Sequence, residues 1–262
     1  MGKEGTIRIL NLFTIMNRGG AETMVMNYYR KIDRTKVQFD FLVHREQKGA
    51  FDDEIKELGG KIYHICPIYP HNFSIYKRMA AQFLDEHPEY HIIHSHISEL
   101  GYFMLKEAYK RNIPVRICHA HNTYYGWDLK MFVRIYFKLN IRKYVTHMFA
   151  CSMDAGEWLF GKRNHDRIRV INNAIDTSLF QYKESVRENV RKELGIQGKF
   201  VIGNVGRFEK QKNHTFVIDV FKKICKKRDD AVLLLVGGGK IEMPYYEKSR
   251  KTSFVGEGNF SW

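Results

Sequence analysis

The feature that most restricts the fold is a regular alternation of short apolar runs with longer segments whose apolar residues recur at helical spacing. The runs at 7–13 (IRILNLF), 37–43 (VQFDFLV) and 115–121 (VRICHAH) have the length of buried strands. Strands that alternate with helices in this way predict a parallel sheet with helices on both faces. We therefore expect an α/β protein built on a doubly wound parallel sheet.

The alternation runs to about residue 175 and then restarts, which predicts two domains, 1–175 and 176–262. The second begins with a polar connection and then offers two strands, at 199–205 and 231–237, around one helix at 213–227. Two strands and one helix cannot cover a parallel sheet on both faces. After about residue 240 the sequence shows no clear periodicity, so we expect an incomplete second α/β domain in a C-terminally truncated chain.

Charge restricts the class of partner. The chain has 43 basic and 29 acidic residues and a net charge of +14, so it attracts anions such as nucleic acid, lipid headgroups or nucleotide phosphates. We expect no nucleic-acid partner, because no nucleic-acid motif accompanies the charge. The N-terminus lacks an apolar secretory segment, and the four cysteines are widely spaced. Both observations predict a cytoplasmic protein with reduced thiols.

A glycine pair follows the first predicted strand, in the segment NRGGAE at 17–22. Gly19 and Gly20 allow close approach of a ligand to the backbone, and the amides at the start of the next helix favour a phosphate or carboxylate. The alternative is a tight strand–helix turn that needs glycine for its geometry alone.

Four histidines close two other strands, and alternation places His94 with His96 and His119 with His121. A metal site of four imidazoles is one interpretation, but no carboxylate or cysteine has ligand-like spacing nearby, so we expect no metal. The other interpretations are contact with a substrate and buried rings bonded to the backbone. We favour substrate contact for one of His119 and His121.

The segment NVGRFEKQKNH at 204–214 follows the strand of the second domain. Arg207 lies just past that strand, and Lys212 precedes Asn213, a predicted N-cap. Cations beside a helix N-terminus form an anion site, unless both are simply solvated loop residues. The helix is predicted to bury Phe216, Val217, Val220, Phe221 and Ile224.

Six segments now occur in an order and spacing that resemble glycosyltransferase family 4, most of all the bacterial capsular and exopolysaccharide transferases. They are NRGGAE, HSH, HAHN, VINNAIDTSLF, NVGRFEKQKNH and LLLVGGGK, and they cover residues 6 to about 240. The resemblance implies the GT-B architecture, in which a Rossmann-like acceptor-side domain (1–175) and a donor-nucleotide domain (176–262) flank the active site. It also implies transfer of a sugar from a nucleotide donor, usually a UDP-sugar, with retention of configuration and without a metal or other cofactor.

Roles follow from the same resemblance. Arg207 and Lys212 would bind the donor diphosphate and neutralise charge on the leaving UDP. His119 or His121 would face the sugar or phosphate. Donor or acceptor contacts are expected at Gly19, Gly20, Glu22, Asn122 and Asn173. Asn173 stands where the family commonly has glycine, and asparagine tolerates a left-handed backbone.

One departure affects function. The family carries two glutamates eight positions apart in its second domain, and the chain ends before that region. Three readings stay open: an incomplete transferase of doubtful activity, a nucleotide-sugar 2-epimerase of the same fold, and a non-catalytic remnant that binds lipid or acceptor. Product analysis separates the two enzymes.

The segment 127–149 is aromatic and basic, with Lys130, Arg134 and Lys138 recurring every four residues. Phe132, Ile135, Tyr136 and Leu139 lie mostly on the other helix face. Such a helix either lies on anionic lipid or covers the sheet with a solvated basic face. Because similar enzymes act on lipid-linked acceptors, the resemblance favours contact with the inner face of the plasma membrane. The acceptor is expected to be lipid-linked or a saccharide.

Overall fold

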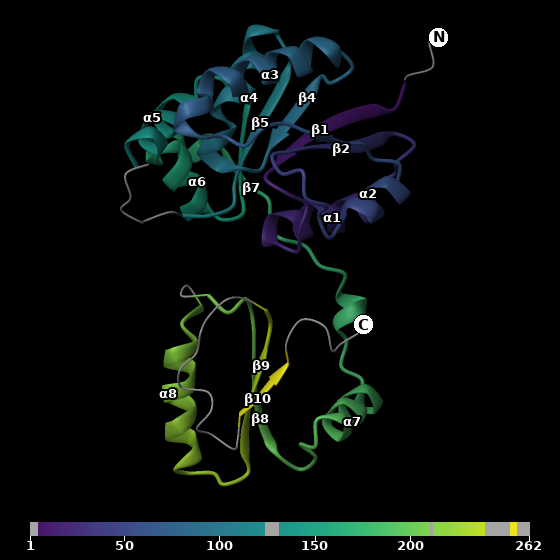
Figure 1. Ribbon diagram of the computed structural model, residues 1–262, viewed down its shortest axis with the longest axis vertical. Coiled ribbons are helices and arrows are strands. Elements are labelled where there is room, and N and C mark those ends of the chain that lie inside the picture. The colour runs from purple at the N-terminus through teal and green to yellow at the C-terminus, as the bar shows by residue number, and fades with distance from the viewer. Residues whose placement is uncertain (1–4, 124–130, 210–211, 239–251, 256–262) are drawn as a thin grey trace. The chain divides into compact units, whose positions relative to one another are not determined.

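The computed structural model describes residues 5–123, 131–209, 212–238 and 252–255 (Figure 1). The chain divides into two compact units, Met1–Thr177 and Ser178–Trp262, and each unit is described by itself.

The first unit is built on a parallel sheet of seven strands in the order β3-β2-β1-β4-β5-β6-β7. The strands are β1 (Ile7–Phe13), β2 (Val37–Val43), β3 (Ile62–His64), β4 (Ile92–Ser95), β5 (Val115–Ala120), β6 (His147–Ala150) and β7 (Ile168–Val170). Strand order reverses between β1 and β4, so this is the point where an open sheet of this kind places its ligand. The expected doubly wound α/β fold is confirmed.

Helices cover both faces of this sheet (Figure 1). They are α1 (Gly20–Lys31), α2 (Asp52–Glu57), α3 (Phe73–Glu86), α4 (Tyr102–Lys110), α5 (Met131–Ile141) and α6 (Met153–Phe160), with short 3-10 turns at Pro70–Asn72, Ser98–Gly101, Lys162–Arg167 and Thr177–Phe180. Side-chain alternation along β1 divides the core: Leu10 and Leu12 pack with α3 to α6, and Phe13 packs with α1 and α2. Asn11 therefore lies on the Phe13 face.

The second unit contains α7 (Glu184–Glu193), β8 (Phe200–Val205), α8 (His214–Cys225), β9 (Ala231–Val236) and β10 (Thr252–Val255). Its strands are parallel in the order β10-β9-β8. The prediction of two strands was therefore incomplete, because β10 lies beyond residue 240, where no period was recognised. A strand of four residues is too short to display one.

The predicted inner face of α8 is also partly wrong. Phe221 is buried against Leu233 and Leu235 of β9, with Val217 and Ile224 packed beside it. Phe216 and Val220 are 63% and 41% exposed. The apolar residues of α8 form a stripe on the helix that is wider than its contact with the sheet. Only the side of α8 that meets β9 is buried.

Within the described ranges, no helix has both the length and the apolar character needed to cross a bilayer.

Candidate functional site

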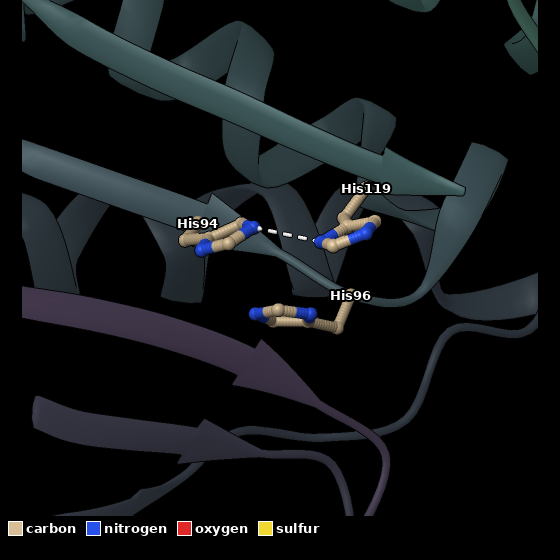
Figure 2. A group of neighbouring side chains, drawn as sticks. All are labelled: His94, His96 and His119. Carbon is tan, nitrogen blue, oxygen red and sulfur yellow. Dashed lines mark hydrogen bonds between the residues drawn. The ribbon is translucent and has the colours of Figure 1, made fainter. Parts of the chain in front are cut away.

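The carboxyl ends of β4 and β5 carry four histidines. His94 and His96 lie two residues apart at the end of β4, and His119 and His121 do so at the end of β5. Because strand side chains alternate, each pair shares a face, with ring centroids 3.9 Å apart in the first pair and 4.1 Å in the second. Figure 2 shows the rings of His94, His96 and His119 gathered beside the strand ends.

The rings are joined by hydrogen bonds between their nitrogens. Nε2 of His94 lies 3.3 Å from Nδ1 of His119, and Nδ1 of His96 lies 2.9 Å from Nε2 of His121. The other nitrogen of His96, Nε2, lies 3.3 Å from Oδ1 of Asn11. The alternative of buried rings bonded to the backbone is therefore wrong for these contacts, which run from side chain to side chain.

Burial keeps the rings neutral. Desolvation lowers the pKa of His94 to about 3, that of His119 to about 2 and that of His121 to about 4. For His96, burial together with the neighbouring imidazoles holds the pKa well below its usual value. At neutral pH each ring therefore carries one N–H and one lone pair.

The cluster has the spacing of a metal site. One nitrogen from each of His94, His96 and His119 lies within 4.8 Å of the others, and neutral imidazoles are ligands for zinc or copper. In the part of the chain that the structure describes, no carboxylate or thiol joins this group. The hydrogen bonds between the rings account for their clustering without a metal. That the site holds no metal stays a prediction.

The two histidines expected at a substrate differ in accessibility. His119 is 0% exposed, and its Nε2 has no hydrogen-bond partner among the described residues. His121 is half-buried, and Asn122 after it is exposed. Of the two histidines, His121 is therefore the one that a ligand can reach.

Gly19 and Gly20, in the first loop, have different surroundings. A Cβ on Gly19 would lie 2.1 Å from Oε2 of Glu22, so this glycine leaves room for that carboxylate. A Cβ on Gly20 would meet no atom within 4 Å. Glu22 lies in the first turn of α1, where the helix dipole favours a negative charge. The Glu22 carboxylate thus lies beside Gly19, in the loop for which the sequence suggested a phosphate or carboxylate ligand.

The segment after β7 is attached to α1. The hydroxyl of Tyr28 donates to the carbonyl of Asn172 at 3.1 Å, and Nδ2 of Asn27 donates to the carbonyl of Ala174 at 2.8 Å. Asn173 is exposed between them and does not adopt a left-handed backbone. The suggestion that asparagine replaces glycine there for its left-handed tolerance is wrong.

The predicted cations of the second unit lie at the end of β8. Arg207 is exposed and pairs with Glu209 at 3.1 Å. Lys212 is also exposed, and its aliphatic carbons extend past Gly206, 3.6 Å from where a Cβ on that glycine would stand. Both charged groups are exposed at the carboxyl edge of this sheet, and an anion there would compete with Glu209 for Arg207.

The start of α8 departs from the predicted cap. Asn213 precedes the helix with a left-handed backbone (φ 48°, ψ 47°), and its side chain makes no capping hydrogen bond. The next residue, His214, is 3% exposed, and neither ring nitrogen has a partner among the described residues. A buried ring without partners is costly, and no sequence pattern predicted it.

Comparison with known proteins identifies the family. Residues 18–179 match Glycosyltransferase Family 4, and residues 186–255 match Glycosyl transferases group 1. The chain belongs to glycosyltransferase family 4. The second match extends past residue 240, up to which the sequence motifs could be followed.

Relatives of this family 4 chain include a protein named as a glycosyltransferase, EpsF of Bacillus subtilis. It is 34% identical over 257 residues, which cover 95% of this chain and 67% of the relative. The capsular polysaccharide biosynthesis glycosyltransferase CapH of Staphylococcus aureus is 24% identical over 249 residues, which cover 92% of this chain and 64% of CapH. The crystal structure of Anabaena HepE with UDP superposes with a TM-score of 0.75 at 18% identity, and the match covers 95% of this chain and 69% of HepE. The chain thus spans about two thirds of these proteins and shares the GT-B fold.

The expected basic face of this family 4 chain is half-buried at the two cations that the structure describes. The segment 127–149 is not one helix, because α5 ends at Ile141 and β6 begins at His147; Lys130 lies outside the described residues. Arg134 lies 3.6 Å from the buried carboxylate of Glu99, and Nζ of Lys138 lies 4.4 Å from the ring centre of Trp158. Both cations are half-buried and contact the protein, so neither is a fully solvated side chain.

The outer face of α5 is apolar instead. The exposed side chains are Phe132 (73%), Ile135 (41%), Tyr136 (54%) and Leu139 (50%). Beside them is a cavity of about 510 Å³ with walls from α3, α4 and α5. Its lining combines aromatic rings with Lys77 and Lys106.

Proposed function

We propose that this chain transfers a sugar from a UDP-sugar to a lipid-linked or saccharide acceptor during exopolysaccharide assembly, with retention of configuration. The observation that carries the proposal is the family match along both units, together with a relative, CapH, that is named for capsular polysaccharide biosynthesis. The UDP bound by the structurally similar HepE supports UDP as the nucleotide. No metal or other cofactor is assigned to the reaction.

The donor diphosphate binds at the start of α8. Arg207 and Lys212 supply two exposed cations at the end of β8, and the first amides of α8 are not capped by Asn213. Uncapped amides and the positive end of the helix dipole attract an anion. The same groups stabilise the negative charge that develops on UDP as the sugar leaves, which is the role a metal ion plays in other phosphate chemistry. Buried His214 gives the site a further polar group without a partner.

Contacts for a saccharide are proposed separately, within the first unit. His121 and Asn122 are within reach of a ligand at the end of β5. Glu22 repels phosphate and accepts hydrogen bonds from hydroxyl groups, so it suits a saccharide, and the open space at Gly20 leaves room for one. Asn173 supplies an exposed amide at the end of β7.

The acceptor is presented at a membrane surface. The exposed aromatic and aliphatic face of α5 can enter the interface of a bilayer, and Lys77 and Lys106 beside it attract anionic headgroups. The protein is then cytoplasmic and peripheral at the inner face of the plasma membrane, where a lipid-linked acceptor would be available.

The test is a calorimetric titration of UDP into the full chain and into Arg207→Ala. We expect saturable binding that weakens at least about tenfold in the variant, since a charge-assisted contact is worth about 1.5–3 kcal/mol. The matched control is Lys226→Ala, which removes one exposed cation at the other end of α8 and should leave affinity unchanged. Absence of UDP binding by the folded chain contradicts the donor assignment.

Product analysis then identifies the reaction. The chain is incubated with UDP-sugars and membrane extract, and the products are examined by NMR. A transferred sugar with the anomeric configuration of the donor agrees with the proposal. An inverted product contradicts retention, and an isomerised free donor would identify a 2-epimerase.

A further inference from the structure

Asn11 is a polar residue in the middle of β1, and its orientation is fixed by the backbone. Its side chain is 1% exposed. Nδ2 donates to the carbonyl oxygens of Ile9 at 3.3 Å and Asp40 at 3.4 Å. Carbonyl oxygens only accept hydrogen bonds, so the NH₂ group must face them. Oδ1 is thereby turned toward His96.

The amide oxygen determines where His96 carries its proton. Oδ1 of Asn11 lies 3.3 Å from Nε2 of His96, and an oxygen that only accepts requires an N–H at that position. Because the buried ring is neutral, Nδ1 then holds a lone pair. The ring of His96 is stacked on Phe13, with centroids 4.4 Å apart and planes 6° from parallel, so its orientation is set as well.

The lone pair of His96 sets the proton of His121 in turn. Nδ1 of His96 lies 2.9 Å from Nε2 of His121, so Nε2 of His121 must donate. A neutral His121 then has its lone pair at Nδ1. Among the described residues nothing is hydrogen-bonded to that atom, and the ring is half-buried at the carboxyl end of β5. The lone pair is available to a ligand.

We propose that Asn11 and His96 are positioning residues that hold His121 in its Nε2–H tautomer, so that Nδ1 of His121 accepts a hydrogen bond from a hydroxyl group of a bound sugar. A phosphate oxygen is excluded as the partner, because it offers no proton to a lone pair at neutral pH. That the ligand is a sugar rests on the proposed function. The tautomer itself follows from the contacts of Asn11 and His96 and from the neutrality of the buried rings, and it does not depend on the ligand.

The tautomer is measured directly by long-range proton–nitrogen NMR on the full chain labelled with ¹⁵N-histidine, at pH 7.5. His121 is assigned by the signal lost in His121→Gln. The expected result is an Nε2–H ring at both His96 and His121. A His121 ring with its proton on Nδ1, or a doubly protonated ring, overturns the proposal.

Two variants test the relay. Asn11→Leu removes the accepting oxygen with little change in volume and should convert His96 and His121 to mixed tautomers. His96→Phe keeps the stacking on Phe13 and removes the acceptor for His121, so it serves if the first variant does not fold. The control is His94→Gln, which leaves the relay intact and should leave the tautomer of His121 unchanged. An unchanged His121 in both relay variants contradicts the proposal.

Activity separates this inference from the function on which it rests. Asn11→Leu should lower kcat/KM about tenfold, the value of one hydrogen bond, without changing the Kd for UDP. Donor sugars that each lack one hydroxyl group locate the contact. For one of these deoxy sugars the wild-type kcat/KM should be lowered by a similar factor, and His121→Phe should lower kcat/KM for that sugar no further. If wild-type protein transfers no sugar but its His121 is the Nε2–H tautomer, the proposed function fails and the relay stands. Transfer that is equally fast in Asn11→Leu overturns the relay and leaves the function intact.

Discussion

Nδ1 of His96 lies 2.9 Å from Nε2 of His121, across the neighbouring ends of β4 and β5. Only one of these two nitrogens can carry a proton, because two N–H groups would be two donors facing each other. The pair His94–His119, at 3.3 Å, has the same requirement. At most one ring of each pair can therefore be charged, and burial lowers the pKa of the four imidazoles so that they stay neutral.

Stability should accordingly fall in mild acid. The folded-state pKa values of His94, His119 and His121, about 3, 2 and 4, lie below the ordinary value near 6.5. Below pH 6.5 these imidazoles bind protons in the unfolded chain but stay neutral in the folded chain. The free energy of unfolding therefore declines as the pH falls from about 6.5 to about 4. Each ring contributes up to about 1.4 kcal/mol per pH unit in that window. Urea denaturation at a series of pH values measures the slope.

The control for this slope is His91→Gln, which changes an exposed histidine outside the cluster and should leave the slope unaltered. In His119→Gln the slope should become shallower. A free energy of unfolding that is constant between pH 6.5 and pH 5 would show that the rings are not held neutral.

Asp40 should be essential for the stability of the first unit. Its carboxylate is 0% exposed and accepts hydrogen bonds from Nε of Arg8 at 2.6 Å, the Tyr90 hydroxyl at 2.7 Å and the Lys61 amide at 2.7 Å. Asp40→Asn leaves Arg8 without a countercharge and turns an accepting oxygen into a donor. We expect a loss of about 3–5 kcal/mol in the free energy of unfolding.

Thermal and urea denaturation measure this loss. Asp166→Asn makes the same change at an exposed carboxylate and should alter stability by less than about 0.5 kcal/mol. Equal stabilities for the two variants would contradict the role of Asp40 in the buried network.

Two glycine-to-alanine changes should have opposite effects. At Gly156 in α6, a Cβ would lie 2.6 Å from Cγ2 of Ile168, inside the core, so alanine should cost about 1–3 kcal/mol by overpacking. At Gly20, the first residue of α1, a Cβ meets no neighbour, and alanine should be neutral or stabilise by up to about 1 kcal/mol. Melting temperatures compare the pair. A Gly156→Ala variant as stable as Gly20→Ala would mean that α6 can shift away from β7.

The outer face of α5 should carry the proposed membrane contact. Phe132→Ser removes its most exposed aromatic ring and should weaken binding to phosphatidylglycerol vesicles about tenfold, since burying such a ring is worth about 1.5–3 kcal/mol. Phe216→Ser, at a phenylalanine that is 63% exposed in the second unit, is the matched control. Vesicle co-sedimentation measures both. A loss shared equally by the two variants, or no vesicle binding by the wild type, refutes this surface.

Helix α5 illustrates what apolar spacing can and cannot predict. The spacing correctly divided its residues into two sets, because a helix repeats every 3.6 residues. Which set faces the protein depends on what the neighbouring elements offer. The buried carboxylate of Glu99 and the ring of Trp158 contact Arg134 and Lys138, which are half-buried, whereas Phe132 and Tyr136 are exposed. Neither partner is adjacent to α5 in sequence.

The sequence by itself determined the alternation of strands and helices, the restart of the pattern near residue 175 and the gathering of polar residues at strand ends. These are local properties, because strand and helix periods are written in neighbouring residues. Only the tertiary structure decided that β1 lies beside β4, which brings Asn11 to His96 across 85 residues of chain. Strand order depends on how whole elements pack together. A lone asparagine in an apolar strand therefore acquires a role only once the sheet has formed.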